Sequence, residues 1–353
     1  MPNNGTLSWA VFKVIGDMDT SMDVDSDLIL GWARIGVLML CMGWAAWFDH
    51  KERRVSNEHW IVWTKPIVFI WSLDLLIQAP HWSVWLTASA LLAFASGAVL
   101  GRPTLRDARQ GNRVDQLVLL WYLISVVGLV VGAMRFMQSS PLDVLVGDAS
   151  SEATLWWSYI GALFTLFVVD LAWRFRFIHG GADAKALMWV TLLFPSWAAV
   201  PVHYDSAMDE LILHLPPSLS LLIWGGFLFV LIPFILFVRN LMTGSVRSIS
   251  DLVMSWMALS IPLASVRNRH VWILTDTMEM PSGETVLHHR KRAPRKTPTD
   301  TELDEHIERL EAFGANRIWV SLKLPLLLFL FPAIVPFWLI GDPMASLLPL
   351  ILP

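Results

Sequence analysis

The sequence predicts an α-helical polytopic membrane protein, with about eight transmembrane helices and a small α+β cytoplasmic module before the last helix. Three observations favour this fold class. Hydrophobic residues make up 55% of the 353 residues, charged residues only 16%, and the mean hydropathy is +0.54. A soluble chain of this length could not bury so much apolar surface in one core. Apolar stretches of membrane-spanning length recur along the chain, and basic residues gather in alternate loops.

Eight stretches are long and apolar enough to cross the hydrocarbon of a membrane, which takes about 20 residues of helix. They lie near residues 28–48, 60–79, 82–100, 115–134, 154–173, 186–203, 217–238 and 318–340. One long polar region separates the last two. We therefore divide the chain into a membrane domain over 1–238, a cytoplasmic or interfacial module over 239–317, and a final transmembrane helix with a C-terminal tail over 318–353.

The charges of the loops predict the orientation of the spans. The loops after the first, third and fifth spans are basic and contain Lys51, Arg53, Arg54, Arg102, Arg106, Arg109, Arg113, Arg174 and Arg176. The loops after the fourth and sixth spans are acidic and contain Asp143, Asp148, Glu152, Asp205, Asp209 and Glu210. Because Lys and Arg favour cytoplasmic loops, we expect a multi-pass protein of the cell membrane with both termini outside.

The composition excludes several other classes. The net charge of −4 is small and the basic residues are spread over short loops, so nucleic acid is not an expected partner. The single cysteine, Cys41, permits neither an internal disulfide nor a cysteine-based zinc site. Acidic residues at positions 17–27, in place of a basic segment, argue against a cleaved signal peptide, and the first helix is expected to remain in the mature protein.

The polar region 239–317 carries the signals of a small α+β module. It opens with Ser250 to Val266, an apolar segment too interrupted for a span, which we expect to lie in the membrane interface. Two strand-like runs, Val271 to Met280 and Glu284 to Arg290, flank Pro281-Ser282-Gly283 and predict a β-hairpin. The run from Thr299 to Glu302 predicts the capped start of a helix, and Gly314 its end.

The basic run from His288 to Lys296 begins within the second strand-like run and continues beyond it. Its charge suits contact with anionic lipid headgroups, and an ordinary solvated cytoplasmic loop would have the same composition.

Two aspartates at the ends of apolar stretches are the candidate functional residues. Asp49 closes the first span, and Asp183 lies in a Gly-Gly-Ala-Asp-Ala-Lys run that precedes the sixth. The predicted topology places both on the cytoplasmic side. Ionisable groups at the edge of a bilayer are costly and often functional. Asp74 and Asp170 have apolar flanks and no glycine run, so we expect them to make interhelical hydrogen bonds or line a polar cavity.

A pair of adjacent carboxyl groups favours aspartic-type hydrolysis. Because like charges cannot both ionise cheaply, one group stays protonated while the other acts as a base toward water, without a metal or another cofactor. Gly180 and Gly181 would let a backbone approach and flex, and Ala182 is small. Lys185 would either bias the ionised form of an aspartate or extend to the headgroups.

At these residues the chain resembles the type IV prepilin peptidases, membrane aspartic proteases with a Gly-x-Gly-Asp motif, and especially their archaeal branch, the preflagellin (archaellin) peptidases. Asp49-His50-Lys51 through Val55-Ser56-Asn57 resembles the first-aspartate motif, with Ser56 where the family has proline. Gly180-Gly181-Ala182-Asp183-Ala184-Lys185-Ala186 resembles the Gly-x-Gly-Asp motif, with Ala182 in place of the second glycine. The segment from Arg317 through Pro325 to Gly341-Asp342 is similar to the C-terminal part of archaeal members.

The resemblance implies that Asp49 and Asp183 are the catalytic aspartates. It also implies that Gly180, Gly181 and Ala182 form the active-site loop, with Lys51, Asn57 and Lys185 as supporting residues. The expected substrates are leader-bearing precursors of archaellins or type IV pilin-like subunits, cut on the cytoplasmic side just before their hydrophobic stretch. The chain lacks the cysteine-rich zinc loop and the methyltransferase region of bacterial members, so proteolysis alone is expected.

Three other interpretations stay open. A signal-peptide-peptidase-like intramembrane protease also uses a Gly-x-Gly-Asp motif, but its other aspartate follows a tyrosine inside a helix, and Asp49 follows Phe48. A metal-dependent protease would use His50 and His179, which flank the two aspartates. A transporter or structural membrane subunit would use the aspartates as ion or proton sites.

Overall fold

The computed structural model describes residues 26–201 and 214–346, apart from 268, 282–283, 293 and 295–297. The acidic N-terminal segment before residue 26, the acidic loop at 205–210 and part of the basic run lie outside the described residues.

Six helices in the described part of the chain have the length and apolar composition needed to cross a membrane. They are α2 (Ser26–Glu52), α3 (Asn57–Gln78), α4 (Trp82–Val99), α6 (Arg113–Phe136), α8 (Ser151–Arg174) and the run Pro217–Met242, which comprises α10 (Pro217–Val230) and α11 (Ile232–Met242). Many apolar side chains on their outer faces are exposed, among them Leu117, Met134 and Phe164. Such a surface fits lipid rather than water, so the chain is a helical membrane protein.

Two predicted spans have a different structure. In place of 186–203 the chain forms α9 (Gly181–Leu193), which ends before Pro195 because proline disfavours helical conformation in the preceding residue. The predicted span 318–340 is wrong at its start, because β5 (Arg317–Leu322) is a strand, and the helix α14 (Leu327–Leu339) begins only after Pro325. At about 1.5 Å per residue, helices of this length reach roughly 20 Å, less than the hydrocarbon thickness.

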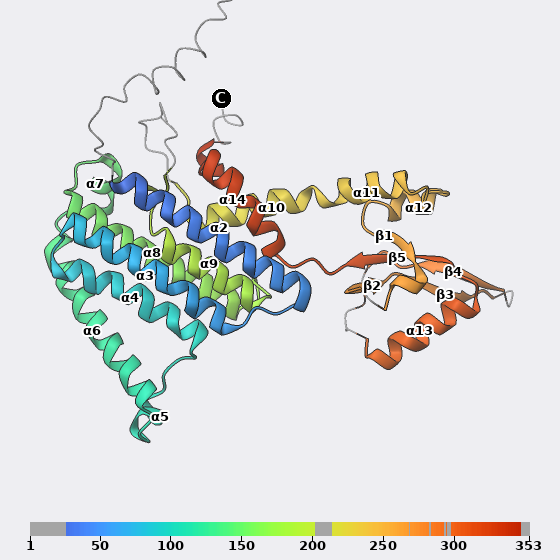
Figure 1. Cartoon of the computed structure of the whole chain (residues 1–353), viewed down its shortest axis with the longest axis horizontal. Helices are drawn as coiled ribbons and strands as arrows, with labels where there is room; N and C mark the ends of the chain where they lie inside the picture. The colour runs from blue at the N-terminus through green and yellow to red at the C-terminus, as the bar shows by residue number, and fades with distance from the viewer. Residues whose placement is uncertain are drawn as a thin grey trace, which may run out of the picture.

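Helix α9 lies in the middle of the bundle. It packs against α2, α3, α4, α8, α10 and α14, as Figure 1 also shows. Its residues from Ala186 to Leu193 are all buried, and a helix that is apolar on every side suits such a central position. The first turn of α9, which carries Asp183, is thereby held inside the ring of longer helices.

The connections bring the two sequence motifs to one end of the bundle. Four residues join α2 to α3, and six join α8 to α9. Because short connections join antiparallel neighbours, the C-terminal ends of α2, α4 and α8 lie at the same end as the N-terminal ends of α3, α6 and α9. We call this the Asp49 end. The short helix α5 (Leu105–Arg109) also lies there, and α7 (Pro141–Val146) lies at the opposite end (Figure 1).

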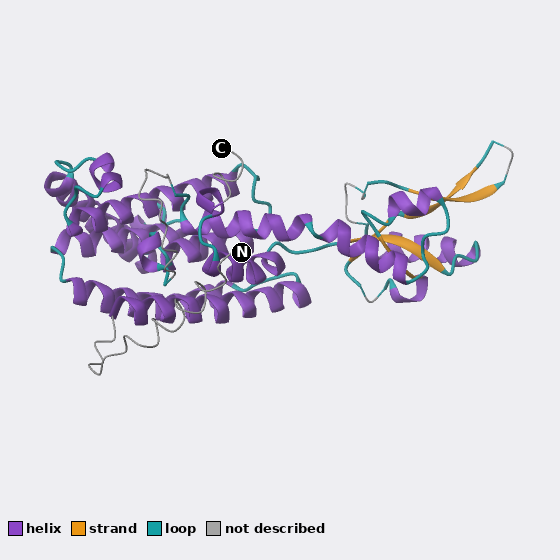
Figure 2. Cartoon of the chain, turned by 90° about the horizontal axis from the view of Figure 1, so that it is seen from above, coloured by secondary structure: helices purple, strands orange, loops and turns teal. Residues whose placement is uncertain are grey.

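A mixed α and β unit follows α11 and lies beside the bundle (Figures 1 and 2). It contains α12 (Ile249–Met254), β1 (Leu259–Pro262), β2 (Val271–Ile273), β3 (Thr275–Glu279), β4 (Thr285–His289), α13 (Asp300–Ala312) and β5. Strands β1, β5 and β2 form an antiparallel sheet in that order, and β3 pairs with β4. Their buried side chains, such as Ile261, Ile307 and Val320, form a core separate from that of the bundle.

The local predictions in this unit have mixed outcomes. The hairpin of β3 and β4 is confirmed, and so is the Thr299 capping box, in which Thr299 and Glu302 cap each other's backbone. The predicted strand 271–280 is split, because β2 pairs with β5 and only β3 pairs with β4. The segment 250–266, which we expect in the membrane interface, contains most of α12 and all of β1. The predicted boundary between 317 and 318 cuts β5, whose Ile318 and Val320 pair with β1, so this strand belongs with the unit that precedes it.

Candidate functional site

Asp49 lies in the last turns of α2, where the chain turns into α3. Only 8% of Asp49 is exposed. The helix ends at Glu52, and Arg53 adopts a left-handed conformation with φ of 56°. Ser56, which replaces the proline of the resembled motif, accepts a hydrogen bond from the His59 backbone N–H and caps α3. Serine at this position therefore starts the next helix by a side-chain cap.

Asp183 lies in the first turn of α9, three residues after the N-cap residue Gly180. This turn precedes residue 186, where the predicted span begins. Burial and the charge of Asp49 raise the pKa of the Asp183 carboxyl to about 7. A helix N-terminus would favour the ionised form, so burial and the neighbouring carboxylate outweigh it here. The two candidate aspartates thus lie at the same end of the bundle, and the charge of Asp49 acts on Asp183.

Neither of these carboxyl groups has a hydrogen-bond or ion-pair partner among the described residues, whereas other buried acids in the bundle do. Asp74 pairs with the buried Arg34. Asp170 accepts hydrogen bonds from Arg102 at 2.6 Å and Arg174 at 2.8 Å. The prediction of an interhelical hydrogen bond is confirmed for Asp74, whose partner lies on α2. Asp170 instead bonds to Arg102 in the loop after α4 and to Arg174 of its own helix.

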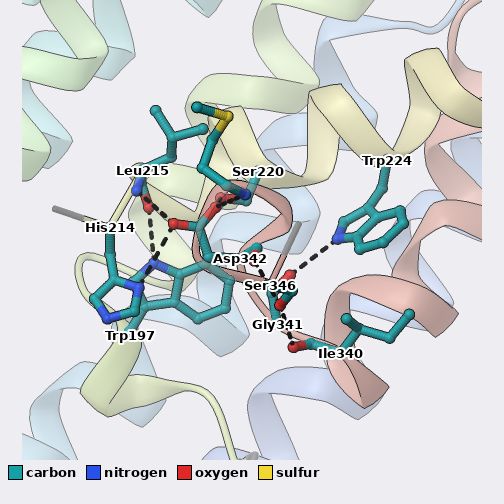
Figure 3. Close-up of polar contacts among 10 residues, drawn as sticks. Trp197, His214, Leu215, Ser220, Trp224, Ile340, Gly341, Asp342 and Ser346 are labelled. Atoms are coloured by element: carbon teal, nitrogen blue, oxygen red, sulfur yellow. Dashed lines mark hydrogen bonds and ion pairs between the residues drawn. The ribbon is translucent and has the colours of Figure 1, made fainter. Parts of the chain in front are cut away.

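Asp342 is a third structural acid, and Figure 3 shows its polar contacts where the end of α14 meets the start of α10. Its carboxylate accepts hydrogen bonds from the backbone N–H of Leu215 at 2.8 Å and of Met344 at 3.1 Å, and from the Ser220 hydroxyl at 3.2 Å. The His214 ring lies 3.5 Å from it. Asp342 therefore ties the end of α14 to the start of α10, and its acceptor atoms are occupied.

Gly180 leaves room for the Asp183 carboxylate. Its φ of −87° is ordinary for any residue, but a Cβ at this position would lie 2.1 Å from the Asp183 Oδ2 atom. The Asp183 side chain folds back over the glycine, and any larger residue would displace the carboxylate. A Cβ on Gly181 would lie 3.3 Å from the Trp173 ring. Ala182 is partly buried and packs against the core of the bundle.

Two of the predicted supporting residues meet. The Lys185 ammonium donates a hydrogen bond of 2.6 Å to the Asn57 side-chain oxygen, and the Asn57 amide donates one of 2.9 Å to the Val99 carbonyl. Lys185 also lies over the Trp173 ring, with Nζ 5.9 Å from the ring centroid. This link joins α3, α4, α8 and α9 at the Asp49 end.

Three other residues singled out from the sequence, Lys51, His50 and His179, take no part in the contacts described above. Lys51 is exposed on the last turn of α2. His50 and His179 are also exposed. Within the residues that the structure describes, no group of three or more His, Cys, Asp or Glu side chains could hold a metal ion.

Arg53 and Lys323 are two site residues that the motifs did not single out. The positive charge of Arg53 acts on Asp49, four residues earlier, while burial lowers the pKa of the guanidinium. Burial and the charge of Arg53 lower the pKa of Lys323, which follows β5 and lies 4.0 Å from the Trp272 ring centroid. For Arg53, the signal available in the sequence was its spacing of four residues from Asp49. For Lys323 there was no such signal, because its approach depends on folding of the mixed unit against the Asp49 end.

No protein-family model and no curated protein matches this chain.

Proposed function

We propose that this chain is a membrane-embedded aspartic endopeptidase. It removes short basic leader peptides from archaellin or type IV pilin-like precursors at the cytoplasmic face of the cell membrane. The observation that carries the proposal is the contrast among the acids of the bundle. Asp74, Asp170 and Asp342 each accept hydrogen bonds from other side chains or backbone groups, whereas Asp49 and Asp183 interact electrostatically with each other and have no hydrogen-bond donor among the described residues. Buried polar groups without partners are rare outside functional sites.

The proposed roles of Asp49 and Asp183 follow from their different surroundings. With a pKa of about 7, Asp183 holds a proton near neutral pH. Burial raises the pKa of Asp49 as well, but the positive charge of Arg53 opposes this rise, so we assign Asp49 as the base. Asp49 takes a proton from water, the resulting hydroxide attacks the peptide carbonyl carbon, and Asp183 protonates the carbonyl oxygen. Collapse of the tetrahedral intermediate breaks the C–N bond. The amine leaves with the proton that Asp49 had taken, and Asp183 regains its own from the intermediate's hydroxyl.

The proposed topology has eight crossings, with α9 from residue 186 onward and α14 as two short ones. The Asp49 end would then face the cytoplasm together with the mixed α and β unit, and both termini would lie outside. The basic loops and the acidic loops of the sequence support this orientation. A cysteine at the exposed position Arg54 should resist a membrane-impermeant thiol reagent in intact cells, and one at Gln138 should react. Labelling at position 54 from outside would place the proposed site on the wrong face.

A leader-bearing precursor fits this arrangement by charge. Its apolar stretch would lie in the bilayer, and its basic end would reach the cytoplasmic headgroup level, where the acidic pair lies. Reversal of the last basic charge of the leader should therefore slow cleavage strongly. Membrane lipids and the precursor are the expected partners, and no cofactor is part of the mechanism.

The alternatives make different predictions in one assay. A signal-peptide-peptidase-like enzyme would cut within an apolar helix, and a transporter or structural subunit would cut nothing. A metal-dependent enzyme using His50 and His179 would lose activity on chelation and regain it with zinc. Incubation of the purified protein with a leader-bearing precursor, with and without chelator, followed by mass measurement of the new N-terminus, separates these outcomes.

A further inference from the structure

A cavity of about 470 Å³ opens between α3, α4 and α9, with Trp121 of α6 on one side. This volume is within the range of small-ligand sites. Its walls are almost wholly apolar and include Val68, Leu92 and Leu192. The cavity is separate from the carboxyl pair, since neither Asp49 nor Asp183 lines it.

Among the residues that the structure describes, Lys65 and Lys185 are the only charged groups that line this cavity. Neither has an ion-pair partner among the described residues. Three arginines of the bundle, in contrast, have carboxylate partners: Arg34 pairs with Asp74, and Arg102 and Arg174 pair with Asp170. An apolar pocket that carries two uncompensated ammonium groups favours a ligand with a hydrocarbon body and a negative head.

The shape of the cavity suggests how such a ligand would lie. Its lining begins at the Asp49 end with Leu100 and Lys185 and continues along α4 to Leu92 and along α9 to Leu192. Eight residues of helix rise about 12 Å, so the cavity extends from the end of the bundle well into the apolar zone. Lys65 lies two turns into α3, and its long stem can carry the ammonium back toward the same end.

We propose that this cavity binds a phospholipid with an anionic headgroup. The headgroup phosphate contacts Lys185 and Lys65 at the Asp49 end, and one acyl chain lies along α4 and α9. Basic pockets between membrane helices on the cytoplasmic side hold anionic headgroups by the same electrostatics. The proposal does not depend on peptidase activity.

The proposed lipid site is connected to the carboxyl pair through Lys185. Lys185 donates to Asn57 and lies two residues after Asp183. A headgroup that engages the Lys185 ammonium would compete with this hydrogen bond, so lipid composition would act on the region around Asp183.

The test uses the full-length protein in nanodiscs of phosphatidylcholine that contain a small fraction of a photoactivatable lipid. One probe is a phosphatidylglycerol with a diazirine in its acyl chain, and the matched probe is a phosphatidylcholine with the same chain. After irradiation and digestion, mass spectrometry maps the labelled peptides. We expect labelling around Ile61 to Val68 and Leu92 to Leu100 to be about tenfold stronger with the anionic probe.

Variants decide whether the two lysines are responsible. The double change Lys65→Gln and Lys185→Gln should reduce anionic labelling to the phosphatidylcholine level. The double change to Arg should retain the preference, and Lys51→Gln, at an exposed position outside the cavity, should leave it unchanged. Equal labelling by the two probes, or an undiminished preference in the double Gln variant, would overturn the proposal. So would complete displacement of the probe by the apolar segment of a precursor, which would identify a different occupant.

Discussion

The Lys185 ammonium donates a hydrogen bond of 2.6 Å to the Asn57 side-chain oxygen, across 128 positions of sequence. Asn57 begins α3 directly after the turn that follows Asp49, and Lys185 lies two residues after Asp183. The bond therefore fixes the two aspartate-bearing segments relative to each other. The hydrogen bond from Asn57 to Val99 extends the link to α4.

Loss of the hydrogen bond between Lys185 and Asn57 should disturb the relative position of the two aspartates and lower the stability of the protein. Lys185→Met keeps the apolar stem and deletes the donor, so we expect slower precursor cleavage and a loss of roughly 1 kcal/mol of stability, since the pair is partly exposed. Asn57→Asp keeps an acceptor for Lys185 and should retain most of the activity. Cleavage rates and thermal unfolding in detergent measure both effects. Unchanged rates in Lys185→Met would rule out a positioning role for the bond.

Gly180→Ala tests the packing of the Asp183 carboxylate. The added Cβ would meet Asp183 Oδ2 at 2.1 Å, so the carboxylate must rotate away from its present position. We expect a large fall in cleavage with little change in folding yield. Gly161→Ala is the matched control, because a Cβ there meets nothing within 4 Å, and its activity should remain at the wild-type level. Full activity in Gly180→Ala would mean that the carboxylate position does not matter.

The pKa of Asp183 sets the pH dependence. Because this pKa is raised to about 7, the Asp183 carboxyl is protonated below that pH and ionised above it. The proposed mechanism needs one protonated and one ionised carboxyl, so cleavage should fall as the pH rises through about 7. Steady-state rates over a series of buffers, with membrane insertion checked at each pH, measure this. A rate that keeps rising above pH 8 would be inconsistent with a protonated Asp183.

The sequence predicted the six longer helices, because hydropathy over membrane length is a local property. The two aspartate motifs were predicted from their positions at the ends of apolar stretches and from the resemblance to the peptidase family. The strand β5 was missed, because Ile318, Trp319 and Val320 read as the start of an apolar span, and only pairing with β1 makes them a strand. The contact between Asn57 and Lys185 and the approach of Lys323 to Arg53 depend on packing between distant segments, which no local pattern specifies.

The paired acids should behave differently from the candidate dyad. Asp170→Asn leaves Arg102 and Arg174 without their carboxylate, and Asp74→Asn leaves the buried Arg34 uncompensated. We expect lower stability, with about 3 kcal/mol lost for the more buried Arg34 pair, but near-normal cleavage per folded molecule. Unfolding temperature and activity per folded protein, measured on the same preparations, separate the two effects. Loss of activity at full stability would give these acids a functional role.

The central claim is that Asp49 and Asp183 act together on a peptide bond. The most direct test is the mass of the N-terminus of a leader-bearing precursor after incubation with purified wild-type protein, Asp49→Asn, Asp183→Asn and the control Asp148→Asn, whose side chain is exposed. The mechanism predicts removal of the leader by the wild type and by the control, and a loss of about a hundredfold or more in each of the other two variants. Leader removal at the wild-type rate by either Asp49→Asn or Asp183→Asn would contradict it.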